Sequence, residues 1–289
     1  MVLQITAWRQ KISSKVMDMN HYTPDMLVKS QWQRTPGISI YYLVYRWVIA
    51  SVFFSILLAS LVELGRPGGM GAVHYAKWII YLTHWGFTAC TIQALLAAYL
   101  VTKAHCRHPD EETDAMKMCL GLKIYWILHS VATVGAFAIT AIYWGFVFDP
   151  AENKLDTLNI LVHAGNSVLM LTDLIIIAHP IRLVDFYWPL AFALSYVSFN
   201  YVYFLAGGTD RKGRSYVYKI LDWRKPVTTL VVIQCCLLLV IIVHVLVSFS
   251  CVLRCKIFQA LRRREEERRE DRTRNLQGAT NEIPINDLV

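Results

Sequence analysis

Long apolar runs separated by short polar segments dominate the chain. A helix needs about 20 apolar residues to cross the hydrocarbon core of a bilayer. Stretches of that length cover residues 38–62, 75–101, 122–147, 158–178, 186–205 and 227–253. Pro189 and Pro226 stand near the start of the last two stretches, where a helix tolerates proline. The pattern predicts an all-α polytopic membrane protein, a bundle of six transmembrane helices over residues 38–253.

Polar segments flank this transmembrane domain. Residues 1–37 form an N-terminal segment without the apolar core of a secretory signal, so the first span is expected to act as its own signal. Residues 254–289 form a charged tail that we expect to be helical at first. From Asn275 onward the tail is polar, which predicts disorder.

The composition fits a membrane protein better than a large soluble domain. Hydrophobic residues make up 55% of the chain and charged residues 17%, whereas soluble domains average roughly 45–50% and 25%. The net charge is +8, and the basic residues gather in the N-terminal segment, the loops and the tail. This distribution favours anionic membrane lipids as partners, and no motif for nucleic acid is present. No feature identifies a protein partner.

The distribution of Lys and Arg predicts the orientation. With six spans both termini lie on one side, and that side carries nineteen Lys and Arg residues against nine on the other. Because basic residues are enriched on the cytosolic side, both termini are expected in the cytosol. The loop of residues 207–225 opposes this assignment, since it alone carries six of the nine.

The cysteines indicate neither a disulfide framework nor a metal site. Seven are present, and most fall within predicted helices or on the predicted cytosolic side, where thiols remain reduced. The stretch "HCRH" at residues 105–108 has a spacing that matches no standard zinc site. We expect no metal and no cofactor.

The start of the tail combines basic residues with two cysteines. Arg254, Lys256 and residues 262–264, all three of them arginine (Arg262, Arg263, Arg264), could bind lipid headgroups. Cys251 and Cys255 lie beside them and are candidate palmitoylation sites. The alternative is a solvated helix, in which Glu265 pairs with the arginines that follow it.

Polar residues recur on one face of the fourth predicted helix, in "HAGNSVLMLTDLIIIAHP". At 100° per residue, His163, Asn166 and Asp173 share one face, and Asn159 lies one turn earlier on the same side. A carboxylate in a spanning helix costs roughly 2.5–3.5 kcal/mol to insert. The face is therefore expected to point toward other helices or a water-filled cavity.

Other predicted helices offer partners for this face. Thr83 lies in the second helix, and His129 in the third. Arg46 lies within the first, where it could extend to the interface or pair with Asp173 or Glu63. These residues, with Asn159, predict an intramembrane polar network.

Two interpretations of the polar residues remain open. They could hold the helices together by interhelical hydrogen bonds, each worth about 0.6–2 kcal/mol. They could instead form a nucleophile and base. In that case Thr83 attacks an acyl carbonyl, His163 accepts its proton, and Asn166 donates to the oxyanion.

Three stretches resemble a known family. "YFLAGGTDRKGRSYVYKILDWRKP", "IYWGFVFDP" and "HAGNSVLMLTD" are similar to segments of the rolling stone family of animal multi-pass membrane proteins, first associated with myoblast fusion in flies. The resemblance covers residues 30 to 255. It implies a role in cell adhesion or fusion during muscle development and a place in the plasma membrane, with the endoplasmic reticulum as the alternative location.

That family is in turn distantly similar to the androgen-induced and androgen-dependent hydrolases, which cleave fatty acid esters of hydroxy fatty acids within the bilayer. In "YLTHWGF", Thr83 matches their nucleophilic threonine. In "HAGNS", His163 is present, but Asn166 stands where their catalytic histidine would fall. Asparagine is no general base, so His163 would have to take that role. The alternative function is thus an intramembrane threonine hydrolase of lipid esters, with a transporter as a weaker third possibility.

Overall fold

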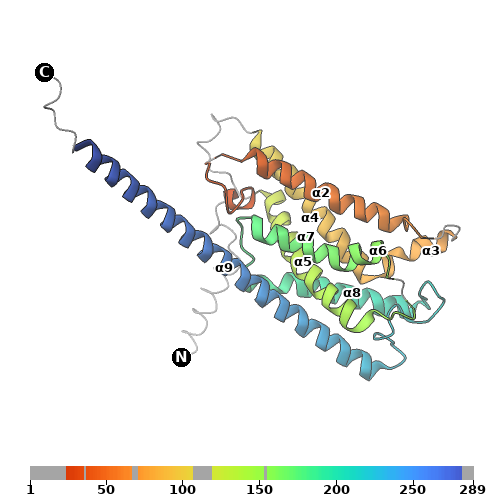
Figure 1. Cartoon of the computed structure of the whole chain (residues 1–289). Helices are drawn as coiled ribbons and strands as arrows, with labels where there is room; N and C mark the ends of the chain where they lie inside the picture. Colours follow the sequence, from red (N-terminus) through yellow and green to blue (C-terminus); the bar gives the residue numbers. More distant parts are fainter. Residues whose placement is uncertain (1–23, 36, 67–70, 107–118, 153–154, 282–289) are drawn as a thin grey trace, which may run out of the picture.

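The computed structural model describes residues 24–35, 37–66, 71–106, 119–152 and 155–281. Within these ranges the chain is helical and contains no strand, only an isolated bridge between Ser30 and Ile177. The helices lie side by side in a bundle, and one of them extends far beyond it (Figure 1). The all-α prediction is confirmed.

Five helices in the described residues are long and apolar enough to cross a membrane. The first is α2, and the third is α5, which continues into a π-helical turn, η5. The fourth consists of α6, a second π-helical turn, η6, and α7. Their bounds are α2 Ile40–Leu61, α4 Leu82–His105, α5 Leu120–Ile142, η5 Tyr143–Val147, α6 Thr157–Ile160, η6 Leu161–Gly165, α7 Asn166–Ile176 and α9 Pro226–Asn281.

The fifth predicted span forms a helix, α8, Tyr187–Leu205, which follows a short 3₁₀ turn at Leu183–Phe186. It is not among the five helices that are apolar enough to cross a membrane, because four tyrosines, two serines and Asn200 lower its mean hydropathy. It nevertheless packs against both α5 and α9 along the bundle (Figure 1). A crossing by α8 stays a prediction.

The second predicted span begins later than expected. Residues 72–80 form a short helix, α3 (Ala72–Ala76), and a 3₁₀ turn, η3 (Lys77–Ile80), before α4 starts at Leu82. Side chains close this break. His84 donates to the carbonyl of Trp78, and Trp85 donates to the carbonyl of Ile79. The carbonyls freed by the break therefore find partners within the bundle, as the bilayer requires.

Helix α4 lies at the centre, between α2 and α5, while α7, α8 and α9 pack on α5. Small residues line the contacts of α4 with α5, so their backbones approach closely; they include Cys90, Ala94, Ala98, Ala132 and Ala136. The outer faces carry exposed Leu, Val, Ile and Phe side chains. An apolar outer surface around a packed interior is expected of helices embedded in lipid.

One end of the bundle, here called the tail end, joins residues 24–35 to α9. Leu27 and Val28 are buried against α5, in contrast to the polar N-terminal segment that we expected. Trp32 contacts the ring of Phe258 at 5.8 Å, and Arg34 binds Glu265 at 2.5 Å. Glu265 thus pairs across the fold rather than along its own helix. The start of α2 and the tail of α9 therefore lie at the same end, while the cytosolic location of that end stays a prediction.

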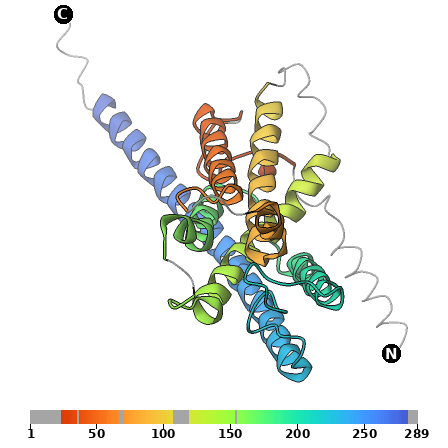
Figure 2. The same ribbon diagram turned by 90° about the vertical axis from the view of Figure 1, so that its right-hand side faces the viewer.

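Helix α9 does not stop at the membrane boundary. It continues without a break to Asn281, so residues 275–281 are helical rather than disordered, and residues 282–289 lie outside the described ranges. The tail contains no proline before Asn281 and carries i,i+4 pairs such as Glu270 with Arg274, which favour helix. Figure 2 shows α9 crossing the bundle obliquely and projecting from it.

Candidate functional site

A buried ion pair connects the first and fourth spans. Arg46 of α2 donates through Nη1 to Asp173 Oδ1 of α7 at 2.6 Å, and both side chains are 1% exposed. Of the expected roles for Arg46, pairing with Asp173 is the one that the structure shows. The two charges compensate each other where neither could be hydrated.

Tyrosine hydroxyls complete the coordination of this pair. Arg46 donates through Nε and Nη2 to the hydroxyl of Tyr42, and through Nη2 to that of Tyr125. The hydroxyl of Tyr45 donates to Asp173 Oδ1 at 3.1 Å. The guanidinium is thus hydrogen-bonded on three sides, which offsets much of its loss of water.

Histidines of α5 and the α7–α8 loop extend the network. His129 is fully buried, with Nδ1 3.2 Å from Gln93 Nε2 and 3.8 Å from Asp173 Oδ2. Its Nε2 is 3.4 Å from the hydroxyl of Thr133. The ring of His179 lies 4.4 Å from that of His129, centroid to centroid. The network therefore joins α2, α4, α5 and α7, as the interpretation of interhelical hydrogen bonding expects.

The polar face of the fourth span does point inward. Asn166 is fully buried, and its Oδ1 accepts from Thr140 of α5. Asn159 is also buried and donates to the hydroxyl of Tyr143 at 2.6 Å. His163 lies in the π-helical turn η6 and stacks on the ring of Tyr143 with an interplanar angle of 5°.

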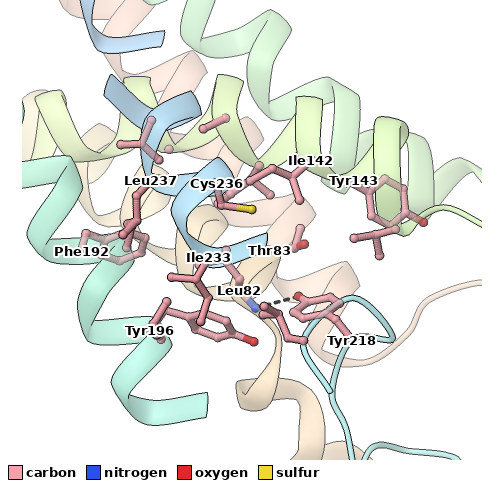
Figure 3. A pocket seen from close by; sticks show the side chains of 18 of the residues that line it. Leu82, Thr83, Ile142, Tyr143, Phe192, Tyr196, Tyr218, Ile233, Cys236 and Leu237 are labelled. Carbon is pink, nitrogen blue, oxygen red and sulfur yellow. Dashed lines mark hydrogen bonds between the residues drawn. The ribbon is translucent and has the colours of Figure 1, made fainter. Parts of the chain in front are cut away.

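Thr83 lies in the wall of an apolar cavity. The cavity has an empty volume of about 870 Å³, including its open side, and lies between α4, α5, α8, α9 and the loop that precedes α9. Figure 3 shows Thr83 beside Tyr218 and Leu82 at one side of it. The backbone N–H of Leu82 donates to the hydroxyl of Tyr218 at 2.9 Å, which fixes this loop over the start of α4.

Thr83 and His163 do not meet as a nucleophile and base would. Within the described residues no hydrogen bond joins their side chains, and His163 is not part of the cavity wall. Tyr143 lines the cavity and also carries the stacked ring of His163. Asn166 is bound to Thr140 rather than directed at Thr83. The three residues proposed for hydrolysis are therefore distributed over two neighbouring regions.

The opposite end of the bundle, here called the loop end, contains a second set of ionic contacts. Glu63, just after α2, accepts from Arg211 of the long loop, and its Oε2 is 3.0 Å from His74 Nε2. Burial opposes the ionisation of Glu63. The hydrogen bond to His74 and the charge of Arg211 outweigh that effect and hold the pKa of Glu63 below its ordinary value. Arg66 binds Asp156, the N-cap of α6, at 2.8 Å.

Most of the cations of the basic loop 206–225 are paired within the fold. Arg214 binds Asp210 at 2.7 Å and Glu152 at 2.7 Å, while Lys212 lies 3.3 Å from Glu152. Arg224 binds Asp222 at 2.8 Å. With Arg211 on Glu63, four of the six basic residues that opposed the predicted orientation are paired with carboxylates.

Two residues predicted for the membrane surface are instead buried at the tail end. Arg254 is 6% exposed because its guanidinium binds the carbonyls of Leu174 and His179 at the end of α7. Cys251 is fully buried, and its sulfur accepts from the backbone N–H of Ile181. Neither side chain is available to lipid headgroups or to palmitoylation in this fold.

The remaining candidates at the tail end are more accessible. Cys255 is half-buried, so its modification stays a prediction, as does lipid binding by the basic residues that follow it. Lys256, Arg263 and Arg264 are exposed on α9, and Arg262 is half-buried, with its guanidinium over the ring of Phe258. Among the described residues no three His, Cys, Asp or Glu side chains converge to hold a metal.

Sequence reasoning missed the tyrosines around Arg46, the His179 ring and most of the cavity wall. Tyr42, in the stretch "IYYLVYRW", is 4% exposed and binds Arg46. The position of Tyr42, four residues before Arg46, is the signal that could have identified this contact, because i and i+4 residues share a helix face.

Comparisons with known proteins identify the family of this chain. The family model described as "Protein rolling stone" matches residues 7–262. Protein rolling stone of Drosophila melanogaster is 34% identical over 212 residues, which cover 70% of this chain and 73% of the fly protein. No solved structure matches the chain. A match over most of the chain, together with this identity, shows that the chain belongs to the rolling stone family.

Proposed function

We propose that this membrane protein acts at the cell surface, in the adhesion or fusion of muscle precursor cells, with the loop end as its recognition surface. The family membership and the apolar helices support a rolling-stone-type membrane protein. The role in fusion and the plasma-membrane location are inferred from the resemblance of the sequence to the rolling stone family.

The observation that carries the proposal is the folded loop 206–225. Its cations are fixed by Glu63, Glu152, Asp210 and Asp222, and Tyr203 binds its backbone at Thr209. A loop held in this way presents a defined surface, and surface loops on rigid scaffolds commonly carry recognition. A mere connection between α8 and α9 would not need such contacts.

A test of this proposal must first place the loop end. Lys219 is exposed in the loop, and Lys123 is exposed at the start of α5, toward the tail end. In intact cells a membrane-impermeant maleimide should label Lys219→Cys above the wild-type signal, whereas Lys123→Cys should require permeabilised cells. The reverse pattern would place the loop in the cytosol and end the proposal.

The second step measures function in a cell–cell fusion assay with cultured myoblasts lacking the endogenous protein. Charge reversal of two exposed loop residues, Lys219→Glu with Lys225→Glu, should lower fusion several-fold at equal surface expression. The matched control, Lys103→Glu with Lys123→Glu, reverses two exposed lysines toward the tail end and should leave fusion unchanged. Equal effects of the two pairs would refute recognition through the loop end.

The second candidate function, an intramembrane threonine hydrolase of fatty-acid esters, is favoured by one observation. Thr83 lies in the wall of an apolar cavity, where a lipid ester could reach it from the bilayer. Against it, His163 would have to move past Tyr143 to accept a proton from Thr83.

Labelling with a fluorophosphonate probe tests the hydrolase directly. Thr83→Ala should abolish labelling of the purified protein, while Thr88→Ala should not, because Thr88 lies further along α4 and donates to the carbonyl of His84. Labelling that is equal in wild type and Thr83→Ala would remove Thr83 as the nucleophile.

A further inference from the structure

The cavity beneath the loop 206–225 is apolar along most of its wall. Twenty residues line it, and none of them carries a charge. Its walls come from three helices that lie next to one another, α5, α8 and α9, and from the start of α4 (Figure 3).

The absence of a side chain at Gly135 leaves part of this space open. Gly135 lines the cavity, and a Cβ added to it would meet no atom within 4 Å. By contrast, a Cβ added to Gly86, in the contact of α4 with α5, would lie 2.4 Å from Ile139. Interiors are normally close-packed, with few voids larger than a water molecule. The open space is therefore specific to the surroundings of Gly135, whereas the contact of α4 with α5 at Gly86 is tightly packed.

Polar groups gather at only one end of the cavity. Thr83 lies in the first turn of α4, Tyr143 begins the turn η5 that follows α5, and Tyr218 belongs to the loop, so all three lie toward the loop end. The other end, formed by residues such as Gly135, Phe192 and Val240, is hydrocarbon. The cavity is thus amphiphilic along its length, with hydroxyl groups toward the loop end and an apolar region at the other end.

The hydroxyl end is neutral. The charged groups near it, Glu63 and Arg211, bind each other and take no part in the cavity wall. A carboxylate or phosphate placed among uncharged hydroxyls would lose its water without gaining a counter-charge, which is costly. A neutral head can exchange hydrogen bonds with such hydroxyls at much lower cost.

From these observations we propose that the cavity binds one hydrocarbon chain of a neutral lipid whose small head carries a hydroxyl, such as a long-chain alcohol or a monoacylglycerol. The chain lies beside Gly135 and Phe192, and the head meets Thr83 and Tyr218. The ligand comes from the surrounding bilayer, since α8 and α9 also face lipid with exposed apolar side chains. The site requires no catalytic step and does not depend on the proposed role in fusion.

Photocrosslinking of the purified full-length protein tests the site. The probe is hexadecanol that carries a diazirine in its chain, and adducts are located by peptide mass spectrometry. In the wild type we expect adducts on the cavity-facing residues of α5, α8 and α9. Gly135→Leu fills the space and should lower these adducts at least fivefold. The matched control Gly145→Leu lies outside the cavity, where an added Cβ also meets nothing within 4 Å, and should leave them unchanged.

Competition on the wild-type protein tests the neutral head and does not depend on the folding of a variant. Unlabelled hexadecanol should displace the probe at a concentration at least tenfold lower than hexadecanoic acid at pH 8. Equal displacement by the acid would overturn the neutral head. Adducts confined to the outer faces of the helices, or equal adducts in Gly135→Leu and Gly145→Leu, would overturn the cavity as the site.

Discussion

Removing one member of the Arg46–Asp173 pair should destabilise the bundle more than removing both. Arg46→Leu leaves the Asp173 carboxylate, 1% exposed, with the hydroxyl of Tyr45 as its hydrogen-bond donor. Breaking a buried pair in this way costs about 3–5 kcal/mol, because an uncompensated charge remains. Asp173→Leu leaves the guanidinium on Tyr42 and Tyr125 and should cost a similar amount.

The double variant Arg46→Leu with Asp173→Leu removes both charges and leaves apolar groups in their place. Such replacements are often close to neutral, while the hydroxyls of Tyr42, Tyr45 and Tyr125 each lose a partner at about 1 kcal/mol. We therefore expect a cost of about 3 kcal/mol, well below the sum of the single variants. The coupling energy should be at least 3 kcal/mol on the same reasoning.

Thermal unfolding in detergent micelles, followed by tryptophan fluorescence, measures the effect. A loss of 3–5 kcal/mol should lower the Tm by roughly 6–20 °C in a chain of this size. The control Asp25→Asn breaks an exposed pair with Lys29 and should change stability by less than about 1 kcal/mol. Additive effects of the single variants, or shifts no larger than that of the control, would refute the role assigned to the pair.

Two further predictions concern the ends of the bundle. The folded state lowers the pKa of Glu63, so its ionised form stabilises the loop end at pH values above the ordinary pKa of 4.5. This stabilisation is lost as the pH falls through the lowered pKa. Unfolding curves measured between pH 7 and 3 should therefore depend less on pH in Glu63→Gln than in the wild type. At the tail end, Arg254→Ala leaves carbonyls of the α7 terminus without their charged donor and should cost about 1.5–3 kcal/mol. Lys256→Ala, exposed on the same helix, should stay within about 0.5 kcal/mol by the same thermal assay.

Much of the helical organisation could be predicted because it depends on local hydrophobicity. The inward direction of the polar face also followed from the sequence, since a carboxylate such as Asp173 has no other place in a bilayer. The start of α4 and the π-helical turn at His163 could not be predicted. They depend on contacts with distant residues, including Trp78 and Tyr143, that no local pattern encodes.

The candidate sites were less accessible to sequence reasoning, because charge alone does not specify a partner. Arg254 looks like other basic residues at a membrane boundary, yet in the fold it meets the end of α7. In the sequence, Arg211 and Arg214 belong to a loop of basic residues without evident partners. In the fold, Arg211 binds Glu63, 148 residues away, and Arg214 binds Glu152, 62 residues away. Such pairings arise only once helices distant in the sequence have packed together.

One continuous helix, α9, carries a wall of the cavity, Arg254 and the projecting tail. At 1.5 Å per residue its 56 residues extend for about 84 Å, farther than any bilayer is thick. Because this length exceeds the thickness of the bilayer, the charged second half of the helix extends into water while Ile233 and Cys236 remain inside the bundle.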